Sequence, residues 1–188
     1  MKKIVLAFYR DEVGEELLLF KKENQSSINR WIHYIDKNFE YIFKSIQIDY
    51  VVRALGSDET SIDNCNTPLD LIGRLLAEKF NAKYVTNILT KTRTQQLKFA
   101  GTEYNRKKIL DDKYNCNLDI LRENGSYLIV DDVSTTGTTF NEIIRAINKA
   151  SKCQADMTCF ALVKTLWNKD YTSNKQKYNS NFYKKLTA

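Results

Sequence analysis

The chain alternates short apolar runs with segments whose apolar residues recur at helical spacing. The apolar runs predict strands over residues 3–9, 49–55, 84–89, 128–132 and 156–164. The helical spacing predicts an amphipathic helix over 29–46, a helix that begins at Thr67-Pro68, and a helix over 139–150. Residues 12–21 fit either a short helix or a second strand. Strands that alternate with helices predict a doubly wound, mostly parallel central sheet flanked by helices, the α/β class.

Composition is that of an ordinary globular protein. The 188 residues are 43% hydrophobic and 28% charged, which suits one domain with a sizeable core. No apolar stretch reaches about 18 residues, so we expect no membrane span. The first apolar run stops at Arg10, too early for a signal peptide. The four cysteines lack C-x-x-C spacing and His33 is the only histidine. We therefore expect no zinc site, and free thiols fit a cytoplasmic location.

One stretch carries the candidate chemistry. Residues 127–139 read Tyr-Leu-Ile-Val-Asp-Asp-Val-Ser-Thr-Thr-Gly-Thr-Thr. The apolar run delivers Asp131 and Asp132 to a strand end, and a hydroxyl-rich loop around Gly137 leads into a helix. Carboxylates suit a sugar diol, and such a loop at a helix N-terminus suits a phosphate. The stretch therefore predicts a phosphorylated sugar as the ligand.

A purely structural interpretation of the same residues is open. Thr139 and Glu142 have the spacing of a capping box, and Gly137 permits a tight turn. That interpretation explains where the helix begins, but it does not explain two consecutive acids. Their like charges lower stability unless a ligand, a cation or hydrogen-bond donors compensate them.

Residues 128–139 closely resemble the phosphoribosyl pyrophosphate (PRPP) signature of type I phosphoribosyltransferases. In that family four apolar residues precede two acids and a Thr-Thr-Gly loop, and the order of predicted elements agrees over residues 48–165. Within the family, residues 92–97 and 103–106 look most like the competence-associated ComF-type branch, although the cysteine-rich zinc element common there is missing. The resemblance implies the type I phosphoribosyltransferase fold for one domain, 1–188. Its parts would be an N-terminal hood (1–46), a PRPP-binding core (48–165) and a basic C-terminal tail (166–188).

The resemblance also implies roles for particular residues. The PRPP-binding segment would comprise Asp131, Asp132, Val133, Ser134, Thr135, Thr136, Gly137, Thr138 and Thr139. Its two acids would hold the ribose 2- and 3-hydroxyls, and residues 134–138 would cradle the 5-phosphate. The pyrophosphate loop would comprise Arg53, Ala54, Leu55, Gly56 and Ser57. The strained cis peptide often found in this loop would fall at Ala54–Leu55. A flexible loop closing over the site would supply Lys91, Arg93, Arg106 and Lys107. The catalytic residues would be Asp131, Asp132, Arg53 and Arg93.

Two of these assignments have structural alternatives. The loop after residue 53 can be a simple strand-to-turn exit, and the basic residues of the long loop can be solvent-facing. Arg53 argues for a ligand, because an arginine at the end of an apolar strand needs an anion. The net charge of +6, concentrated in residues 91–113 and 164–185, fits either nucleic acid or a polyanionic small ligand. The tail after Trp167 has no clear periodicity, so we expect it to be irregular.

The implied activity is transfer of a phosphoribosyl group from PRPP to a nitrogenous base with release of pyrophosphate. Mg²⁺ would be held mainly through the ligand, with Asp131 and Asp132 as candidate protein ligands. The acceptor base is not identified; candidates for stacking on it are Trp31, Tyr34, Trp167 and Tyr171.

Other functions stay open at this point. The chain can be a catalytically silent PRPP- or nucleotide-sensing protein, or a nucleic-acid-associated ComF-like adaptor that uses its basic tail to bind nucleic acid or protein. A homodimer is also open. A phosphoacceptor domain would place its acids on separate strands. Neither G-x-G-x-x-G nor G-x-x-x-x-G-K-[ST] occurs, so dinucleotide and P-loop nucleotide binding have no motif support.

Overall fold

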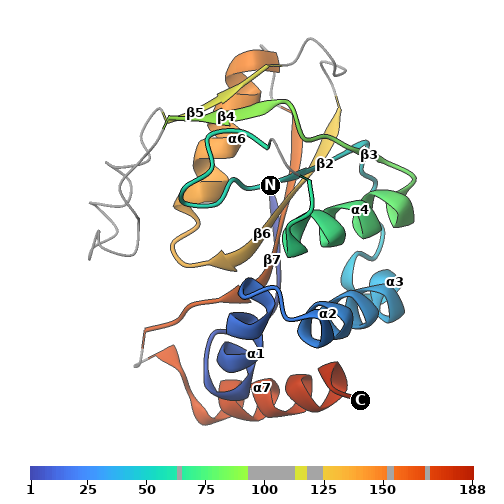
Figure 1. Ribbon diagram of the computed structural model, residues 1–188, viewed down its shortest axis with the longest axis vertical. Helices are drawn as coiled ribbons and strands as arrows, with labels where there is room; N and C mark the ends of the chain where they lie inside the picture. The colour runs from blue at the N-terminus through green and yellow to red at the C-terminus, as the bar shows by residue number, and fades with distance from the viewer. Residues whose placement is uncertain (63–64, 93–112, 118–124, 152–154, 168–169) are drawn as a thin grey trace.

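The computed structural model describes residues 1–62, 65–92, 113–117, 125–151, 155–167 and 170–188. A five-stranded sheet has the order β1-β7-β6-β2-β3, and every pairing in it is parallel (Figure 1). Its strands are β1 (Lys2–Phe8), β2 (Tyr50–Arg53), β3 (Lys83–Tyr84), β6 (Ser126–Ser134) and β7 (Asp156–Lys164). An antiparallel pair is formed by β4 (Leu89–Lys91) and β5 (Tyr114–Cys116). The helices are α1 (Asp11–Lys21), α2 (Gln25–Lys37), α3 (Phe39–Ile42), α4 (Pro68–Phe80), α6 (Thr138–Ser151) and α7 (Ser173–Leu186).

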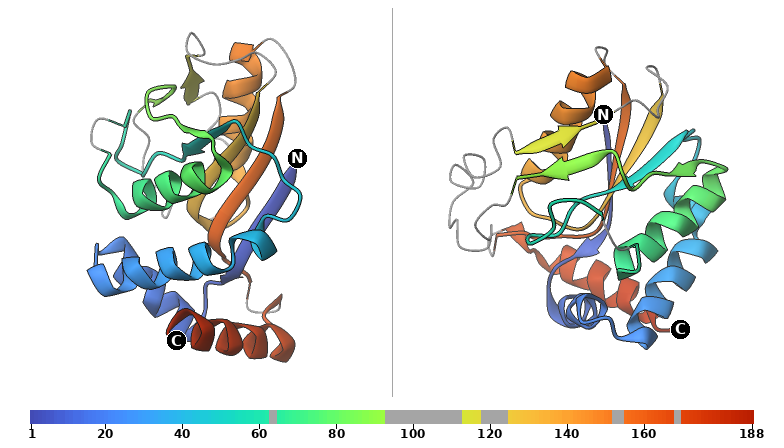
Figure 2. Two further views of the ribbon diagram at one scale, coloured as in Figure 1. Left: turned by 90° about the vertical axis from the view of Figure 1, so that its right-hand side faces the viewer. Right: turned by 45° about the horizontal axis from the view of Figure 1, so that its top comes forward.

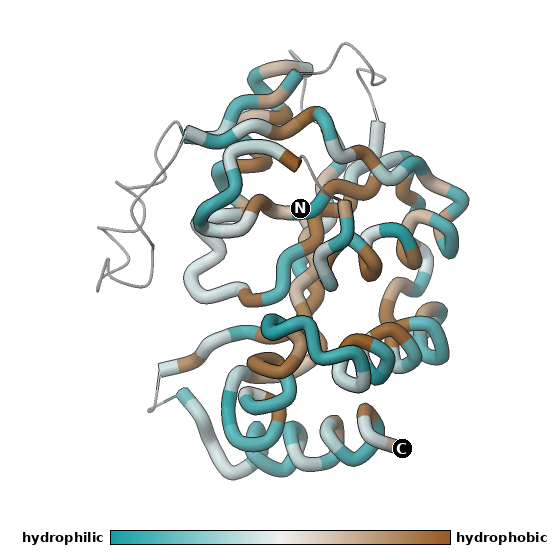
Figure 3. Tube along the Cα trace, viewed as in Figure 1, coloured by the Kyte–Doolittle hydropathy of each residue, from teal (hydrophilic) through white to brown (hydrophobic). Residues whose placement is uncertain are grey.

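Two hydrophobic cores lie on opposite faces of the sheet, because successive side chains of a strand point to opposite sides. In β6, Leu128 and Val130 belong to the first core and Ile129 to the second. The first core contains side chains of α1, α2, α4 and α7, and the second contains those of α6, β4 and β5. Figure 3 shows hydrophobic residues along the central strands. Covering of both faces confirms the predicted doubly wound α/β class.

The N-terminal half differs from the prediction in two places. Residues 12–21 form a helix rather than a strand. The helix expected over 29–46 is two helices, α2 and α3, separated at Asn38. The side chain of Asn38 donates to the backbone oxygen of Tyr34 at 2.8 Å, which offers the backbone an alternative to continuing the helix. α2 also begins earlier than expected, because Asn24 accepts the backbone N–H of Ser27 at 3.0 Å and caps it.

The strand expected over 84–89 is wrong as a single element. β3 ends at Tyr84, and Leu89 opens β4 in the separate antiparallel pair. Val85, Ile88 and Leu89 are all buried in the second core, so their apolar character reflects burial rather than continuous pairing with β2.

The segment after Trp167 was expected to be irregular, and this too is wrong. It contains α7, whose inward side carries Asn179, Phe182 and Leu186. The Asn179 side chain accepts the backbone N–H of Phe8 at 3.0 Å and donates to its oxygen at 2.8 Å. A polar residue thus occupies a core-facing position, which hides the helical spacing. No helix in the described part of the chain is long and apolar enough to cross a membrane.

Candidate functional site

A pocket of about 530 Å³ lies where β2 and β6 end. In parallel sheets of this class, ligands bind outside the carboxyl ends of the strands, and the volume suits a small molecule. The lining residues are Phe20, Lys21, Glu23, Arg53–Ser57, Glu59, Thr67–Leu69 and 131–140. The structure therefore brings the predicted PRPP-binding segment and the predicted pyrophosphate loop to one cavity, together with the end of α1.

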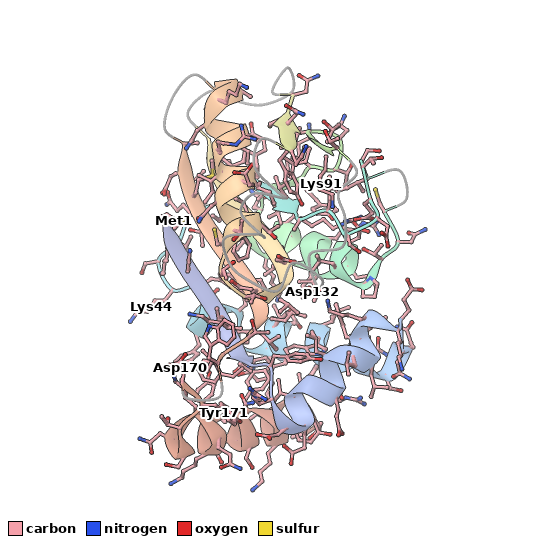
Figure 4. The ribbon with its side chains drawn as sticks, turned by 90° about the vertical axis from the view of Figure 1, so that its left-hand side faces the viewer. Met1, Lys44, Lys91, Asp132, Asp170 and Tyr171 are labelled. Carbon is pink, nitrogen blue, oxygen red and sulfur yellow. The ribbon has the colours of Figure 1, made fainter. Side chains whose placement is uncertain are left out.

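The two adjacent carboxylates have different surroundings. Val130 faces the first core, so alternation along β6 places Asp132 on that side and Asp131 on the other. Asp132 forms an ion pair of 2.9 Å with Lys21 of α1, and Figure 4 shows Asp132 where β6 faces that helix. Asp131 accepts the backbone N–H of Asp132 at 2.9 Å. The chain thus supplies a cation to one carboxylate and a backbone donor to the other.

The surroundings of Asp131 disfavour the charged form of its carboxyl group. Burial raises the pKa of its carboxyl group well above the ordinary range, and the nearby charge of Asp132 raises it further. The backbone N–H of Asp132 and the charge of Lys21 oppose this shift without cancelling it. A ligand that brings hydroxyl donors or a cation to Asp131 would relieve the penalty. Such a perturbed group in a pocket is typical of a functional site.

The loop from Ser134 to Thr138 forms the next part of the pocket wall. Gly137 has a φ of +81°, a conformation that favours glycine, and its backbone oxygen accepts the N–H of Asn141 at 3.0 Å. The hydroxyls of Thr136 and Thr138 lie 2.6 Å apart. α6 begins at Thr138. The first turn of a helix leaves N–H groups without intrahelical acceptors at the positive end of the dipole, which favours an anion in front of this loop.

The structural alternative, a capping box between Thr139 and Glu142, is not what the structure has. α6 begins one residue before Thr139, and the Glu142 carboxylate accepts a hydrogen bond from Nε of Arg145 at 3.1 Å. The chain instead enters α6 through the turn at Gly137 and the hydrogen-bonded hydroxyls of Thr136 and Thr138.

Two lysines near this wall were missed by the sequence analysis. Lys21 reaches Asp132 from α1, and Nζ of Lys3 lies 3.0 Å from the place that a Cβ on Gly137 would take. Each comes from an element far away in sequence, so no local pattern connects it to the site. A cluster of basic residues at the start of a strand was the only available signal for Lys3.

The second wall is the predicted pyrophosphate loop, and its arginine is bonded inside the protein. The Arg53 side chain is 2% exposed, and its Nε lies 2.7 Å from Asp70. Its two terminal nitrogens lie 2.6 and 2.8 Å from the Glu59 carboxylate. Burial opposes the charge of Arg53, but the hydrogen bonds that it donates to Glu59 and Asp70 outweigh burial and raise the pKa of the guanidinium group. The anion expected opposite Arg53 is therefore present, but it belongs to the chain.

Local sequence explains how Asp70 reaches that position. Thr67 caps α4 by accepting the backbone N–H of Asp70 at 3.3 Å, and Asp70 accepts the backbone N–H of Thr67 at 3.0 Å. The other oxygen of Asp70 then bonds Arg53 and the hydroxyl of Tyr84, the latter at 2.6 Å. These hydrogen bonds lower the pKa of Asp70 despite its burial.

Lys91 was expected in a flexible loop, but it lies in β4 with only 5% of its surface exposed. Its Nζ donates to the backbone oxygen of Gly56 and lies 3.4 and 3.5 Å from those of Leu55 and Ser57. The hydroxyl of Tyr114 also donates to Leu55, at 3.3 Å. Lys91 thus fastens the loop from behind, and burial lowers the pKa of its amine.

The remaining loop predictions have separate outcomes. Arg93, Arg106 and Lys107 lie outside the described residues. The described residues contain no cis peptide bond, so the one expected at Ala54–Leu55 is absent.

None of the four candidates for stacking on a base, Trp31, Tyr34, Trp167 and Tyr171, lines the pocket. Trp31 is fully buried and packs on Phe20 and Phe182, so the prediction that it stacks on a base is wrong. Tyr34 packs on Phe182 at a centroid distance of 4.8 Å, and Tyr171 donates to Asp11 at 2.5 Å. Among the described residues that line the pocket, Phe20 and Phe140 are the aromatic ones.

No protein-family model matches the sequence, and no curated protein does. Solved structures with a similar course of the chain include an adenine phosphoribosyltransferase (16% identity, 78% of this chain and 74% of that chain, TM-score 0.48). Another is the adenine phosphoribosyltransferase of Saccharomyces cerevisiae (14% identity, 84% and 77%, TM-score 0.47). A third is adenine phosphoribosyl transferase of Trypanosoma brucei in complex with AMP, pyrophosphate and ribose-5-phosphate (14% identity, 79% and 70%, TM-score 0.43).

Proposed function

We propose that the chain is a phosphoribosyltransferase-like protein of the ComF type that binds PRPP with Mg²⁺ and transfers its phosphoribosyl group to a nitrogenous base. The observation that carries this proposal is the meeting of two features in one pocket. Asp131 and Asp132 lie near the carboxyl end of β6, which ends at Ser134, and the hydroxyl loop at the N-terminus of α6 follows that strand end. Two carboxylates beside a helix N-terminus support this proposal, because carboxylates suit the diol and a helix N-terminus suits the phosphate of a 5-phosphorylated ribose.

The proposed reaction breaks the bond between C1 of the ribose and the pyrophosphate oxygen, whose electron pair leaves with pyrophosphate. A bond forms between C1 and a nitrogen of the base, and that nitrogen loses its proton to solvent. Positive charge develops on the sugar at the transition state. Asp131 and Asp132 orient the diol and lie on the same strand end, while the loop holds the phosphate. The protein contributes positioning and electrostatics rather than a nucleophile.

Mg²⁺ fits this pocket as an ion held largely by the ligand. Asp131 and Asp132 are hard oxygen donors, and Mg²⁺ is usually bound through one or two carboxylates and the phosphates of a substrate. Within the described residues there is no cluster of three or more potential metal-ligating side chains, so a cage built by the protein alone is not the arrangement proposed. The bound ion would neutralise charge on the leaving pyrophosphate.

A second candidate is binding without transfer, which would make the chain a PRPP or nucleotide sensor. The observation in its favour is that Arg53 and Lys91 both bond to the chain itself. Pyrophosphate release from PRPP and Mg²⁺ with a panel of purine and pyrimidine bases separates the two. Base-dependent release supports the transferase, and binding without any release supports the sensor.

The ligand assignment is tested by replacing both acids, Asp131→Asn with Asp132→Asn. We expect the affinity for ribose 5-phosphate and for PRPP with Mg²⁺ to fall by more than about 100-fold, because two charge-assisted hydrogen-bonding groups are lost. Isothermal titration calorimetry measures this, and circular dichroism checks the fold. Asp156→Asn is the control, since it removes an exposed carboxylate at the opposite end of the sheet. Unchanged affinity in the double variant would refute the diol role.

A further inference from the structure

The carboxylate of Glu59 occupies an anion position inside the pocket. One of its oxygens lies 2.6 Å from the backbone nitrogen of Gly56 and 2.6 Å from a terminal nitrogen of Arg53. The other oxygen lies 2.8 Å from the second terminal nitrogen of Arg53. A backbone N–H in a turn together with an arginine fork is the donor set that proteins commonly use for phosphate oxygens. In this chain that set is already filled by an internal anion.

The loop is held so that these donors face Glu59. Lys91 bonds the backbone oxygens of residues 55–57 from the opposite side, and Tyr114 holds that of Leu55. With the oxygens fixed on one side, the N–H of Gly56 is presented on the side of Glu59. The hydrogen bonds from Arg53 and Gly56 lower the pKa of Glu59 although burial opposes this, so the carboxylate is charged at neutral pH.

The two carboxylates on Arg53 differ in how easily they can leave. Asp70 is 0% exposed and is also bonded to Thr67 and Tyr84. Glu59 is 30% exposed and lines the pocket. If Glu59 swings into solvent, Asp70 still compensates the buried charge of Arg53. Departure of Glu59 therefore frees one face of Arg53 and one N–H without leaving an unpaired buried charge.

We propose that Glu59 determines which anions bind at the loop 53–57, by occupying donors that a pyrophosphate group must otherwise share. This inference rests on the proposed function, because it concerns the pyrophosphate half of the same ligand. A ribose 5-phosphate needs only the β6–α6 side of the pocket and leaves Glu59 in place. A ligand that also carries pyrophosphate must displace Glu59, and its affinity is lowered by that step.

The test uses inorganic pyrophosphate with Mg²⁺ as the probe, titrated by calorimetry into wild type, Glu59→Gln, Glu59→Ala and Glu59→Asp. We expect Glu59→Ala to bind pyrophosphate about tenfold more tightly than wild type, because one charge-assisted contact no longer has to be broken. Glu59→Asp keeps the charge on a shorter side chain that cannot span both donors, so it should also bind more tightly. Affinity for ribose 5-phosphate should be unchanged in all of them.

Asp58→Asn is the matched control. It removes the same charge from the neighbouring exposed residue, whose side chain lies 3.4 Å from the Ser57 hydroxyl and not on Gly56 or Arg53. Equal tightening by Asp58→Asn would overturn the proposal, since it would show a general charge effect. No tightening in folded Glu59 variants, or no pyrophosphate binding by any protein of the set, would overturn it too. Thermal melting identifies folded variants, and Glu59→Gln, which keeps the side-chain shape, supplies one if Glu59→Ala unfolds.

The proposed function fails by a different result. If wild type binds pyrophosphate and the Glu59 variants bind it more tightly, but none binds ribose 5-phosphate, the loop inference holds and the ribose site does not. If ribose 5-phosphate binds in a way that depends on Asp131 and Asp132, but pyrophosphate affinity does not change in the Glu59 variants, the ribose site holds and the loop inference does not.

Discussion

The ends of β2 and β6 line the same pocket but differ in how their charges are compensated. At β2, Arg53 meets Asp70 and Glu59, and Lys91 meets three backbone oxygens, so each buried charge has partners from the chain. At β6, burial and the neighbouring charge of Asp132 disfavour the charged form of Asp131 and raise its pKa. The first arrangement holds the fold together, and the second lowers its stability. The difference teaches that a charged residue at a strand end is evidence for a candidate ligand site only where the fold does not compensate its charge.

The largest effect should come from breaking the compensated side. We expect Arg53→Met to lower the free energy of unfolding by about 3–5 kcal/mol, because it leaves Asp70 buried without its cation. Urea denaturation followed by circular dichroism measures this. Lys79→Met is the control: it breaks the exposed pair of Lys79 with Asp36, which should contribute little. If the two variants lose the same stability, Arg53 is not a structural residue and its predicted role toward a ligand regains support.

A smaller change in stability, but a loss of binding, should follow from altering the loop on the β6 side. Gly137→Val forces a β-branched residue into positive φ, which costs about 1–2 kcal/mol, and its Cβ would crowd Nζ of Lys3. We expect the phosphate cradle to distort and binding of ribose 5-phosphate to be lost, as measured by calorimetry. Gly14→Ala is the control, because a Cβ at this position of α1 makes only ordinary contacts and the fold should be slightly stabilised. Normal binding by Gly137→Val would contradict the cradle.

The smallest effect is on the pH dependence of stability, and its sign should differ between the two sides. The pKa of Asp131 is raised in the folded state, so its contribution to stability falls as pH rises from the ordinary aspartate range toward the raised pKa. The pKa values of Glu59 and Asp70 are lowered in the folded state. Their contribution to stability is therefore complete above the ordinary carboxyl range and is lost as pH falls from that range through the lowered pKa values.

Urea denaturation at a series of pH values tests this. Asp131→Asn should remove the decline in stability above the ordinary aspartate range and leave the acid-side loss unchanged. Glu59→Gln should do the reverse by weakening the acid-side loss. If both variants gave the same dependence of stability on pH, the charges at the ends of β2 and β6 would not differ in how they are compensated.

Much of the fold was predictable because, in most strands and helices, apolar residues recur at the positions that the fold buries. β6 and β7 alternate between two cores that both need apolar residues, so their apolar runs mark them clearly. α7 escaped prediction because Asn179 takes a core-facing place that sequence patterns reserve for apolar residues. The prediction of one strand over 84–89 was wrong because residues buried in the second core and residues paired within the sheet both give a short apolar run.

The site was predictable where one continuous stretch forms it, and not where distant elements meet. Residues 131–139 line the pocket as expected. Nothing local shows that Lys21 reaches Asp132, or that Glu59 lies on Arg53. These pairings depend on how α1 and the loop after β2 pack, so they follow from the tertiary fold alone. For the same reason, Arg53 does have anions beside it, but they are Asp70 and Glu59 of the chain and not the ligand for which Arg53 was expected to argue.

The position of β1 has a consequence for how this protein is made. β1 is an edge strand whose sheet partner is β7, with Lys2 opposite Thr158 (Figure 2). β1 therefore leaves the ribosome long before β7 has been synthesised. Contacts between such distant segments close large loops and slow folding. The apolar face of β1 must stay protected from aggregation during that interval, so a chaperone that holds β1 while the rest of the sheet is synthesised should raise the yield more than one that acts after release.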